Sequence, residues 1–197
     1  MKQELDLKNY FSNQMFLDDE VFDSVVGNAD NPEFFGVDCC AFRYIERGFG
    51  LHANTSFDLQ YIKKKKSTFE KDVIRCNGQY ISVPHGQYKK ISFLGGCVWD
   101  YFCEYVTVHY DDGTAENKQF FLYSFSEWGA REYVEYQLIN DCPCKDCYEV
   151  LLVLNGDQVG LHVYQFDLKI DQTLDKNIVG FTLPENENMC IFAITLE

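Results

Sequence analysis

The chain has 197 residues, of which 16% are aromatic, and a net charge of −14 from 31 acidic and 17 basic side chains. A chain of this length can bury the core of one domain, and no linker or repeat divides it, so we expect a single domain over residues 1–197. The acidic charge repels phosphate backbones and anionic lipids, which excludes nucleic acid and membrane surfaces as expected partners.

The N-terminal stretch MKQELDLKNYF has no apolar segment of signal-peptide length, and no window reaches the roughly 18 apolar residues of a membrane span. We therefore expect a cytoplasmic protein, or an extracellular one if the chain was trimmed from an exported precursor. Nine cysteines are an odd number, so they cannot all pair within one chain, and reduced thiols are the simpler expectation. We expect no cofactor, and the sequence does not indicate whether structural calcium is bound.

The first predicted element spans 17–26, where Leu17, Val21 and Val25 have helical spacing, and this short segment is typical of one helix or of an ordered loop. The four lysines at 63–66 indicate a solvated loop or a protected edge strand rather than a basic binding patch. Runs that alternate with a period of two then predict strands at 37–45, 78–83, 89–95, 104–110, 118–125, 148–155, 159–168, 178–183 and 189–196.

The clearest of these strands is EYVTVHY at 104–110. Val106, Val108 and Tyr110 share one face, and the residues at 105, 107 and 109 share the other. Both faces are largely apolar or aromatic, which predicts a strand covered on both sides. The turn at 111–114 contains an Asp-Gly pair, and KQFFLYSF follows it, so the segment predicts a β-hairpin.

Several short strands separated by turn signals predict an all-β fold. The turn signals are Asn77-Gly78, Pro84-His85-Gly86, Asn155-Gly156 and Pro184-Glu185-Asn186. We expect a jelly-roll β-sandwich of two mainly antiparallel sheets, with Val106, Val108, Phe192 and Ile194 among the buried side chains.

The densest cysteine cluster is Cys142, Cys144 and Cys147. A structural zinc site needs four ligands, usually as two separated pairs, and no second pair completes this one. A redox CxxC motif opens a helix, whereas Cys144 and Cys147 precede a predicted strand. We therefore expect free thiols without a bound metal.

The four histidines, His52, His85, His109 and His162, lie too far apart in sequence to form the close pair that a metal-binding jelly roll would show. No nucleophile elbow, phosphate-binding loop or dinucleotide fingerprint is present. A glycosidase needs only two carboxylates at a suitable separation, and sequence spacing does not test that arrangement.

The candidate ligand-binding residues are Trp99, Asp100 and Tyr101, which follow Gly95-Gly96 where a strand is expected to give way to a loop. An aromatic face can stack on a sugar ring, and a carboxylate can accept bonds from its hydroxyl groups. The alternative is that Trp99 and Tyr101 cap the core. Trp128 ends a predicted strand and is expected in the core.

Three stretches, GQYISVPHGQYKKISFLGGCVWDYF, VTVHYDDGTAENKQFFLYSFSEW and IVGFTLPENENMCIFAITLE, carry a family resemblance. The matching positions are Gln79, Pro84, Leu94-Gly95, Tyr110, Asp112-Gly113-Thr114, Trp128, Leu183-Pro184 and Ile191 to Leu196. They resemble jelly-roll domains attached to bacterial glycoside hydrolases, including some fucosidase and mannosidase types, which look like carbohydrate-binding modules with the galactose-binding-like fold. The chain departs from that pattern at Glu127, where an Asp is usual, and in the cysteine-rich loop at 142–147.

The resemblance implies a non-catalytic carbohydrate-binding module, an accessory to glycoside hydrolysis, with carbohydrate as the partner. Fold alone does not fix function, so two alternatives stay open. One is a structural or protein-interaction domain without a sugar site, and the other is a glycosidase built on the same sandwich. The sequence does not indicate the oligomeric state.

Overall fold

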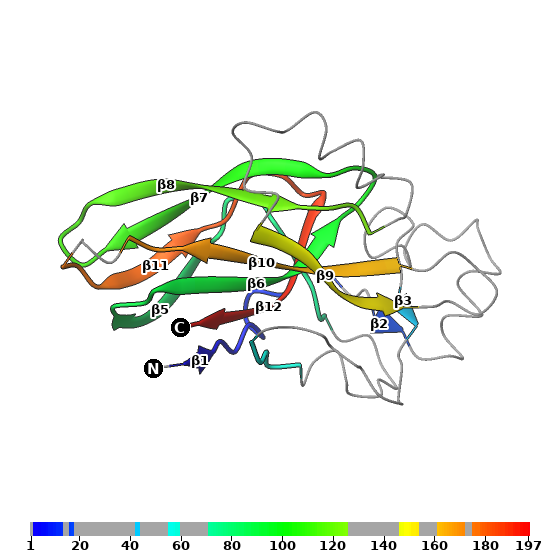
Figure 1. The fold of residues 1–197 in the computed structure, drawn as a ribbon, viewed down its shortest axis with the longest axis horizontal. Coiled ribbons are helices and arrows are strands. Elements are labelled where there is room, and N and C mark those ends of the chain that lie inside the picture. Colours follow the sequence, from blue (N-terminus) through cyan, green and yellow to red (C-terminus); the bar gives the residue numbers. More distant parts are fainter. Residues whose placement is uncertain are drawn as a thin grey trace.

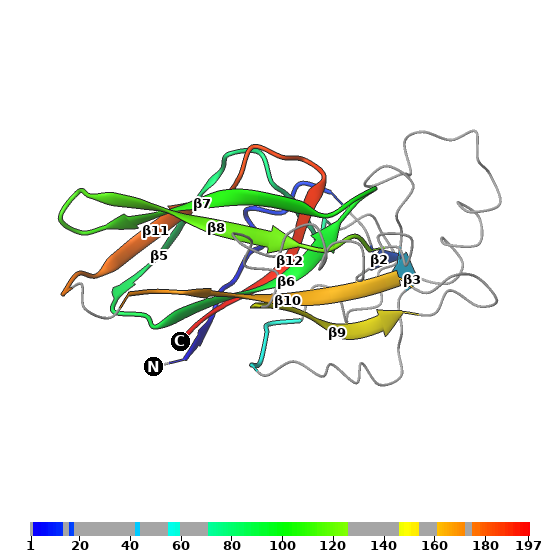
Figure 2. The same cartoon turned by 45° about the horizontal axis from the view of Figure 1, so that its top comes forward.

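The computed structural model describes residues 2–13, 16–17, 42–43, 55–59, 71–125, 146–153, 161–171 and 175–197. These residues form two facing antiparallel sheets, which Figure 2 shows as two layers, and a two-stranded parallel sheet (Figures 1 and 2). No helix long and apolar enough to cross a membrane occurs in this part of the chain. The prediction of an all-β sandwich is confirmed.

The larger sheet follows the order β1 (Gln3–Glu4), β12 (Met189–Leu196), β6 (Lys90–Cys97), β10 (Leu161–Lys169) and β9 (Cys147–Val153), with β4 (Ile74–Arg75) also paired to β12. The smaller sheet follows the order β5 (Tyr80–Gly86), β11 (Ile178–Thr182), β7 (Phe102–Tyr110) and β8 (Ala115–Leu122). The parallel pair is β2 (Phe16–Leu17) and β3 (Phe42–Arg43). The chain crosses repeatedly between the two large sheets, as in jelly-roll sandwiches.

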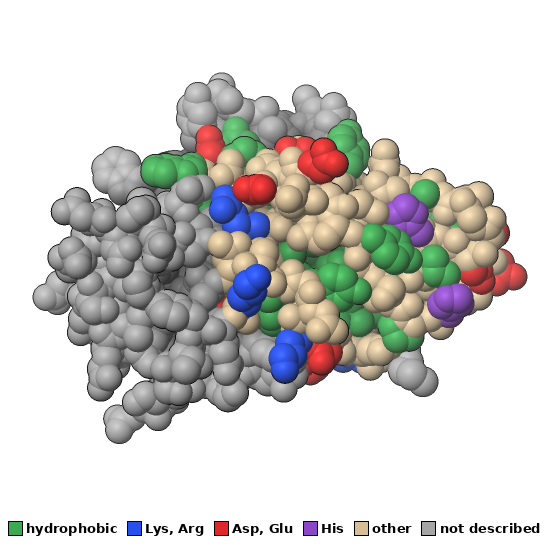
Figure 3. Space-filling view, turned by 180° about the vertical axis from the view of Figure 1, so that it is seen from behind, with side chains coloured by type: hydrophobic (Ala, Val, Ile, Leu, Met, Phe, Trp, Pro, Cys, Tyr) green, Lys and Arg blue, Asp and Glu red, His purple; other side chains and the backbone are tan. Residues whose placement is uncertain are grey.

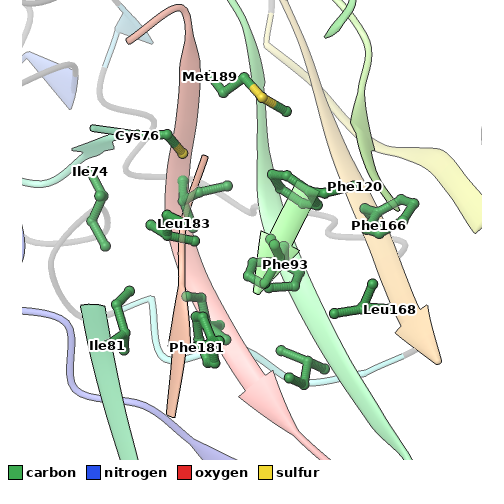
Figure 4. Close-up of a cluster of buried hydrophobic side chains, with 14 of the residues drawn as sticks. Ile74, Cys76, Ile81, Phe93, Phe120, Phe166, Leu168, Phe181, Leu183 and Met189 are labelled. Atoms are coloured by element: carbon green, nitrogen blue, oxygen red, sulfur yellow. The ribbon is translucent and has the colours of Figure 1, made fainter. Parts of the chain in front are cut away.

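The core lies between the two large sheets and combines aliphatic side chains with a group of phenylalanine rings (Figure 4). The ring centroid of Phe93 in β6 lies 4.8 Å from that of Phe120 in β8 and 5.6 Å from that of Phe181 in β11. This one side chain therefore joins the larger sheet to two strands of the smaller one. The buried side chains expected from the sequence, Val106, Val108, Phe192 and Ile194, are all in the interior.

Strands β7 and β8 form the predicted hairpin. Their antiparallel register runs from Phe102 opposite Leu122 to His109 opposite Ala115. Gly113 has a φ of +81°, a conformation that glycine adopts without steric cost, which explains the Asp-Gly pair in the turn.

The prediction that β7 is covered on both sides is wrong. Val106, Val108 and Tyr110 are buried, but Tyr105 on the opposite side is 55% exposed and His109 is only half-buried. An antiparallel sheet can pack one face on the core and leave the other to solvent, and this sheet does so.

Two turn predictions also need correction. The expected turn at 84–86 is instead the last part of β5. A proline is tolerated there because β5 is an edge strand and its pairing with β11 shifts register at this point, so the missing N–H breaks no regular ladder bond. Gly95 and Gly96 lie inside β6 and do not start a loop. A Cβ on Gly96 would lie 2.3 Å from the Phe125 ring, so close packing accounts for a glycine there.

Some predictions fall on residues outside the described ranges. They are the helix or loop at 17–26 beyond Leu17, the strand at 37–45 apart from 42–43, the lysine run at 63–66, the strand ends at 154–155 and 159–160 with the Asn155-Gly156 turn, and the residues His52, Glu127, Trp128, Cys142 and Cys144.

Candidate functional site

Trp99 stands at a tight turn between the two large sheets. The Asp100 N–H donates to the Val98 carbonyl oxygen over 2.9 Å, and the φ of Trp99 is +73°. An i to i+2 bond with positive φ at the central residue is the rare, strained form of the γ-turn. The Trp99 side chain is 70% exposed, so it does not cap the core.

Backbone bonds hold the chain on the N-terminal side of this turn. The Cys97 N–H donates to the Tyr123 carbonyl oxygen over 2.8 Å, and the Val98 N–H donates to the Asn188 carbonyl oxygen over 2.9 Å. A strained residue persists where the surrounding structure fixes the chain, and such residues cluster at ligand sites. The turn therefore fixes the backbone of Trp99 and leaves its indole in solvent.

Asp100 and Tyr101 lie beside Trp99 but face different surroundings. Asp100 is exposed, and its Oδ1 accepts from the Tyr101 N–H over 2.8 Å. Tyr101 is half-buried, and its ring centroid lies 5.9 Å from that of Phe121, so it packs on the core. Of the three predicted binding residues, Trp99 and Asp100 reach solvent, and their role in binding stays a prediction.

Strand β7 leads away from this turn with every second side chain on the solvent side of the smaller sheet. We define the outer face as Tyr80 (β5), Thr182 (β11), Tyr105, Thr107 and His109 (β7) and Asn117 (β8). Figure 3 looks onto this side of the molecule, where hydrophobic and histidine side chains gather and most charged side chains lie around the rim.

Hydrogen bonds between strands order the outer face. The Thr107 hydroxyl donates to Asn117 Oδ1 over 2.8 Å. The Nε2 of His109 lies 2.8 Å from Thr182 Oγ1. The rings of His109 and Tyr80 meet edge-on, with centroids 5.4 Å apart. These contacts link β7 to β8 on one side and to β11 and β5 on the other, so side chains from all four strands take part in the ordered outer face.

Sequence reasoning did not single out this surface. It placed residues 105, 107 and 109 on one side of a strand but expected that side to be covered. One pattern in the sequence could have identified Tyr80. Ile81 and Val83 are apolar and share one side of their strand, so Tyr80 points to the other side, away from the core.

The predicted thiol cluster is described only at Cys147, a buried residue that begins β9. Burial raises the pKa values of the Cys76 and Cys97 thiols well above their ordinary value, which keeps these two in the unreactive protonated form. Within the described ranges, no group of three or more His, Cys, Asp or Glu side chains is arranged to hold a metal ion.

A buried carboxylate network joins β6 to β10. Asp167 Oδ1 accepts from the Ser92 hydroxyl and from Gln165 Nε2, both over 2.7 Å. Lys90 Nζ lies 3.4 Å from Asp167 Oδ2 and 3.2 Å from an oxygen of Glu197. A buried carboxylate with this many donors is satisfied, so the arrangement suits a structural role.

Residues 53–197 match a protein family described as the AziU2-like beta-sandwich domain. The chain belongs to this family. The match includes both large sheets except β1, together with Trp99 and the whole outer face. No curated protein matches the chain. Membership of the AziU2-like family agrees with the expected β-sandwich, and its description names no ligand.

Proposed function

We propose that this AziU2-like domain is a non-catalytic module that binds a neutral carbohydrate. The observation that supports the proposal is the exposure of the Trp99 indole at a strained turn. The exposed indole leaves its apolar area in water, and a ligand ring stacked on it removes that area from water.

The neighbours of Trp99 favour a sugar over a purely apolar ligand. Asp100 is exposed, and one of its two carboxylate oxygens bonds to the Tyr101 backbone, which leaves Oδ2 for ligand hydroxyl groups. The resemblance to domains attached to glycoside hydrolases points the same way. A sugar ring offers apolar C–H groups on its faces and hydroxyl groups at its edge, which this pair of side chains complements.

The test uses an array of immobilised neutral glycans, followed by titration of the strongest hit with the wild-type protein, Trp99→Ala and Trp99→Phe. We expect Trp99→Ala to weaken binding at least tenfold and Trp99→Phe to retain most of it, because the phenyl ring keeps an aromatic face. Thermal unfolding of each variant is the control, since an exposed side chain contributes little to stability.

Two results would contradict the proposal. One is the failure of the wild-type protein to bind any neutral glycan on the array. The other is a loss of about 3 kcal/mol or more of unfolding free energy in Trp99→Ala, the usual cost of emptying an aromatic core position. A protein-interaction domain without a sugar site would give the first result.

A further inference from the structure

Tyr80 lies down on the sheet instead of standing out into solvent. A Cβ built on Gly180 would lie 2.2 Å from the Tyr80 hydroxyl oxygen and 2.3 Å from its Cζ, so the ring passes directly over this glycine. The Tyr80 hydroxyl donates to the Val179 carbonyl oxygen over 3.1 Å. Gly180 is therefore the residue that lets a ring from β5 rest on the backbone of β11.

This arrangement fixes Tyr80 with one ring face toward the backbone and the other toward solvent, and the residue is 46% exposed. His109 meets the ring edge-on, and the bond between His109 and Thr182 holds the imidazole in place. A ring that is already immobile loses little conformational entropy when a ligand stacks on it. Tyr80 is thus a preorganised platform parallel to the sheet.

Tyr105 provides a second aromatic side chain on the same face. Tyr80 is opposite Thr182, Thr182 is opposite Thr107, and Tyr105 lies two residues along β7 from Thr107. Strand spacings of about 4.8 Å and rises of about 3.4 Å per residue place the Cα atoms of the two tyrosines about 12 Å apart. That separation exceeds the reach of a single sugar ring.

The surface around the two tyrosines carries no charged side chain among the positions that pair across it. Thr182, Thr107 and Asn117 lie in the same row as Tyr80, and Gln119 lies opposite Tyr105. Ser82, Gly180, His109 and Ala115 form the row on the other side of Tyr80. In a chain with 31 acidic residues, an uncharged surface of hydroxyl, amide and imidazole groups stands out. It complements a neutral, hydroxyl-rich ligand and offers no ion-pair partner to a charged peptide.

We propose that the outer face binds an extended neutral oligosaccharide whose sugar rings stack on Tyr80 and Tyr105. Hydroxyl groups of the intervening sugars bond with Thr107, Asn117 and Thr182. This inference rests on the proposed carbohydrate-binding function and deepens it, because it makes chain length the property that the protein recognises. Gly180 acts as a positioning residue, since it sets the tilt of the Tyr80 ring.

The test titrates the wild-type protein with neutral oligosaccharides of one to six units from the glucose, xylose, mannose, galactose and N-acetylglucosamine series. We expect affinity to rise at least tenfold between the monosaccharide and the longer members of the series that binds. Tyr80→Ala, Tyr105→Ala and Gly180→Ala should each lower hexasaccharide affinity at least fivefold, and Tyr80→Phe should restore most of it. Gly113→Ala is the glycine control, because its φ of +81° makes the substitution strained while the residue lies in the β7–β8 turn, outside the outer face, so hexasaccharide affinity should not change.

A second measurement does not depend on variant stability. In the ¹⁵N-labelled wild-type protein, the hexasaccharide should shift the backbone amide signals of residues 105–109 and 180–182. Affinity that is independent of chain length, or shifts confined to residues 97–101 with only Trp99→Ala impaired, would overturn this inference and leave the proposed function standing. Failure of every neutral glycan to bind would overturn both.

Discussion

At the scale of single residues, Trp99 shows that the fold holds a non-glycine residue in a backbone conformation that such residues disfavour. A positive φ brings the Cβ of an L-residue close to its own backbone and costs about 1–2 kcal/mol. Glycine avoids this cost, yet the sequence keeps a tryptophan whose side chain is mostly in solvent. This cost in folding free energy is a reason to assign the indole a function.

A comparison of two variants measures that strain. Trp99→Ala and Trp99→Gly both remove the ring, but only glycine relieves the positive φ. Because glycine also gives the unfolded chain more freedom, we expect Trp99→Gly to be the more stable of the two by about 1 kcal/mol or slightly less in urea unfolding. Equal stabilities, or a less stable glycine variant, would show that the turn is not strained by its side chain.

At the scale of elements, the β7–β8 turn is tied to the segment that leads into β11. Lys176 Nζ lies 2.8 Å from Asp112 Oδ2 and donates to Thr114 Oγ1 over 2.9 Å. The Asn177 side-chain amide donates to Asp111 Oδ2 over 2.7 Å. These contacts anchor the turn to the strand that pairs with β7, so the sheet ends as a unit and not as a loose hairpin.

The pKa of Asp112 reports on this anchor. Bonds from Lys176, then from the Thr114 side chain and backbone, lower the pKa of Asp112 from its ordinary value of 3.8 to about 2. Its contribution to stability is therefore complete above pH 3.8 and is lost as the pH falls through about 2. A carboxyl ¹³C titration should find the Asp112 pKa near 2 in the wild-type protein and closer to 3.8 in Lys176→Ala. A wild-type pKa at 3.8 would mean that the anchor does not form in solution.

At the scale of the whole molecule, the two sheets are held together by aromatic rings that interlock across the interior. Phe93 contacts Phe120 and Phe181, and Phe120 in turn meets Phe166 of β10 edge-on, with centroids 5.3 Å apart. The chain of contacts runs from β10 through β8 and β6 to β11. Removing a ring at its centre therefore weakens the packing of both sheets.

Phe93→Ala should therefore destabilise the protein by about 3–5 kcal/mol in urea unfolding, the range for a buried phenylalanine. Tyr105→Ala is the matched control, because it removes an aromatic ring from the outer face of the same sandwich, and its effect should stay within about 0.5 kcal/mol. If the two variants lost similar stability, the division between the interior and the outer face described here would be wrong.

Local patterns in the sequence determined much of this fold. Period-two alternation assigned Val106, Val108, Phe192 and Ile194 to the interior, because neighbouring side chains on a strand point to opposite sides. The Asp-Gly pair placed the β7–β8 turn, since a positive φ at Gly113 is a local requirement. These features depend on residues a few positions apart, which a single sequence contains.

Only the tertiary structure decided which of the two sides of β7 is covered, because that depends on strands and loops distant in sequence. The same reason explains why Trp99 and Tyr101, two residues apart, have different surroundings: one is held in solvent by the γ-turn, and the other packs on Phe121 of a neighbouring strand. The placement of Tyr80 over Gly180 joins residues 100 positions apart through the register of β5 and β11. No local pattern encodes that register, which the packing of the whole sandwich sets.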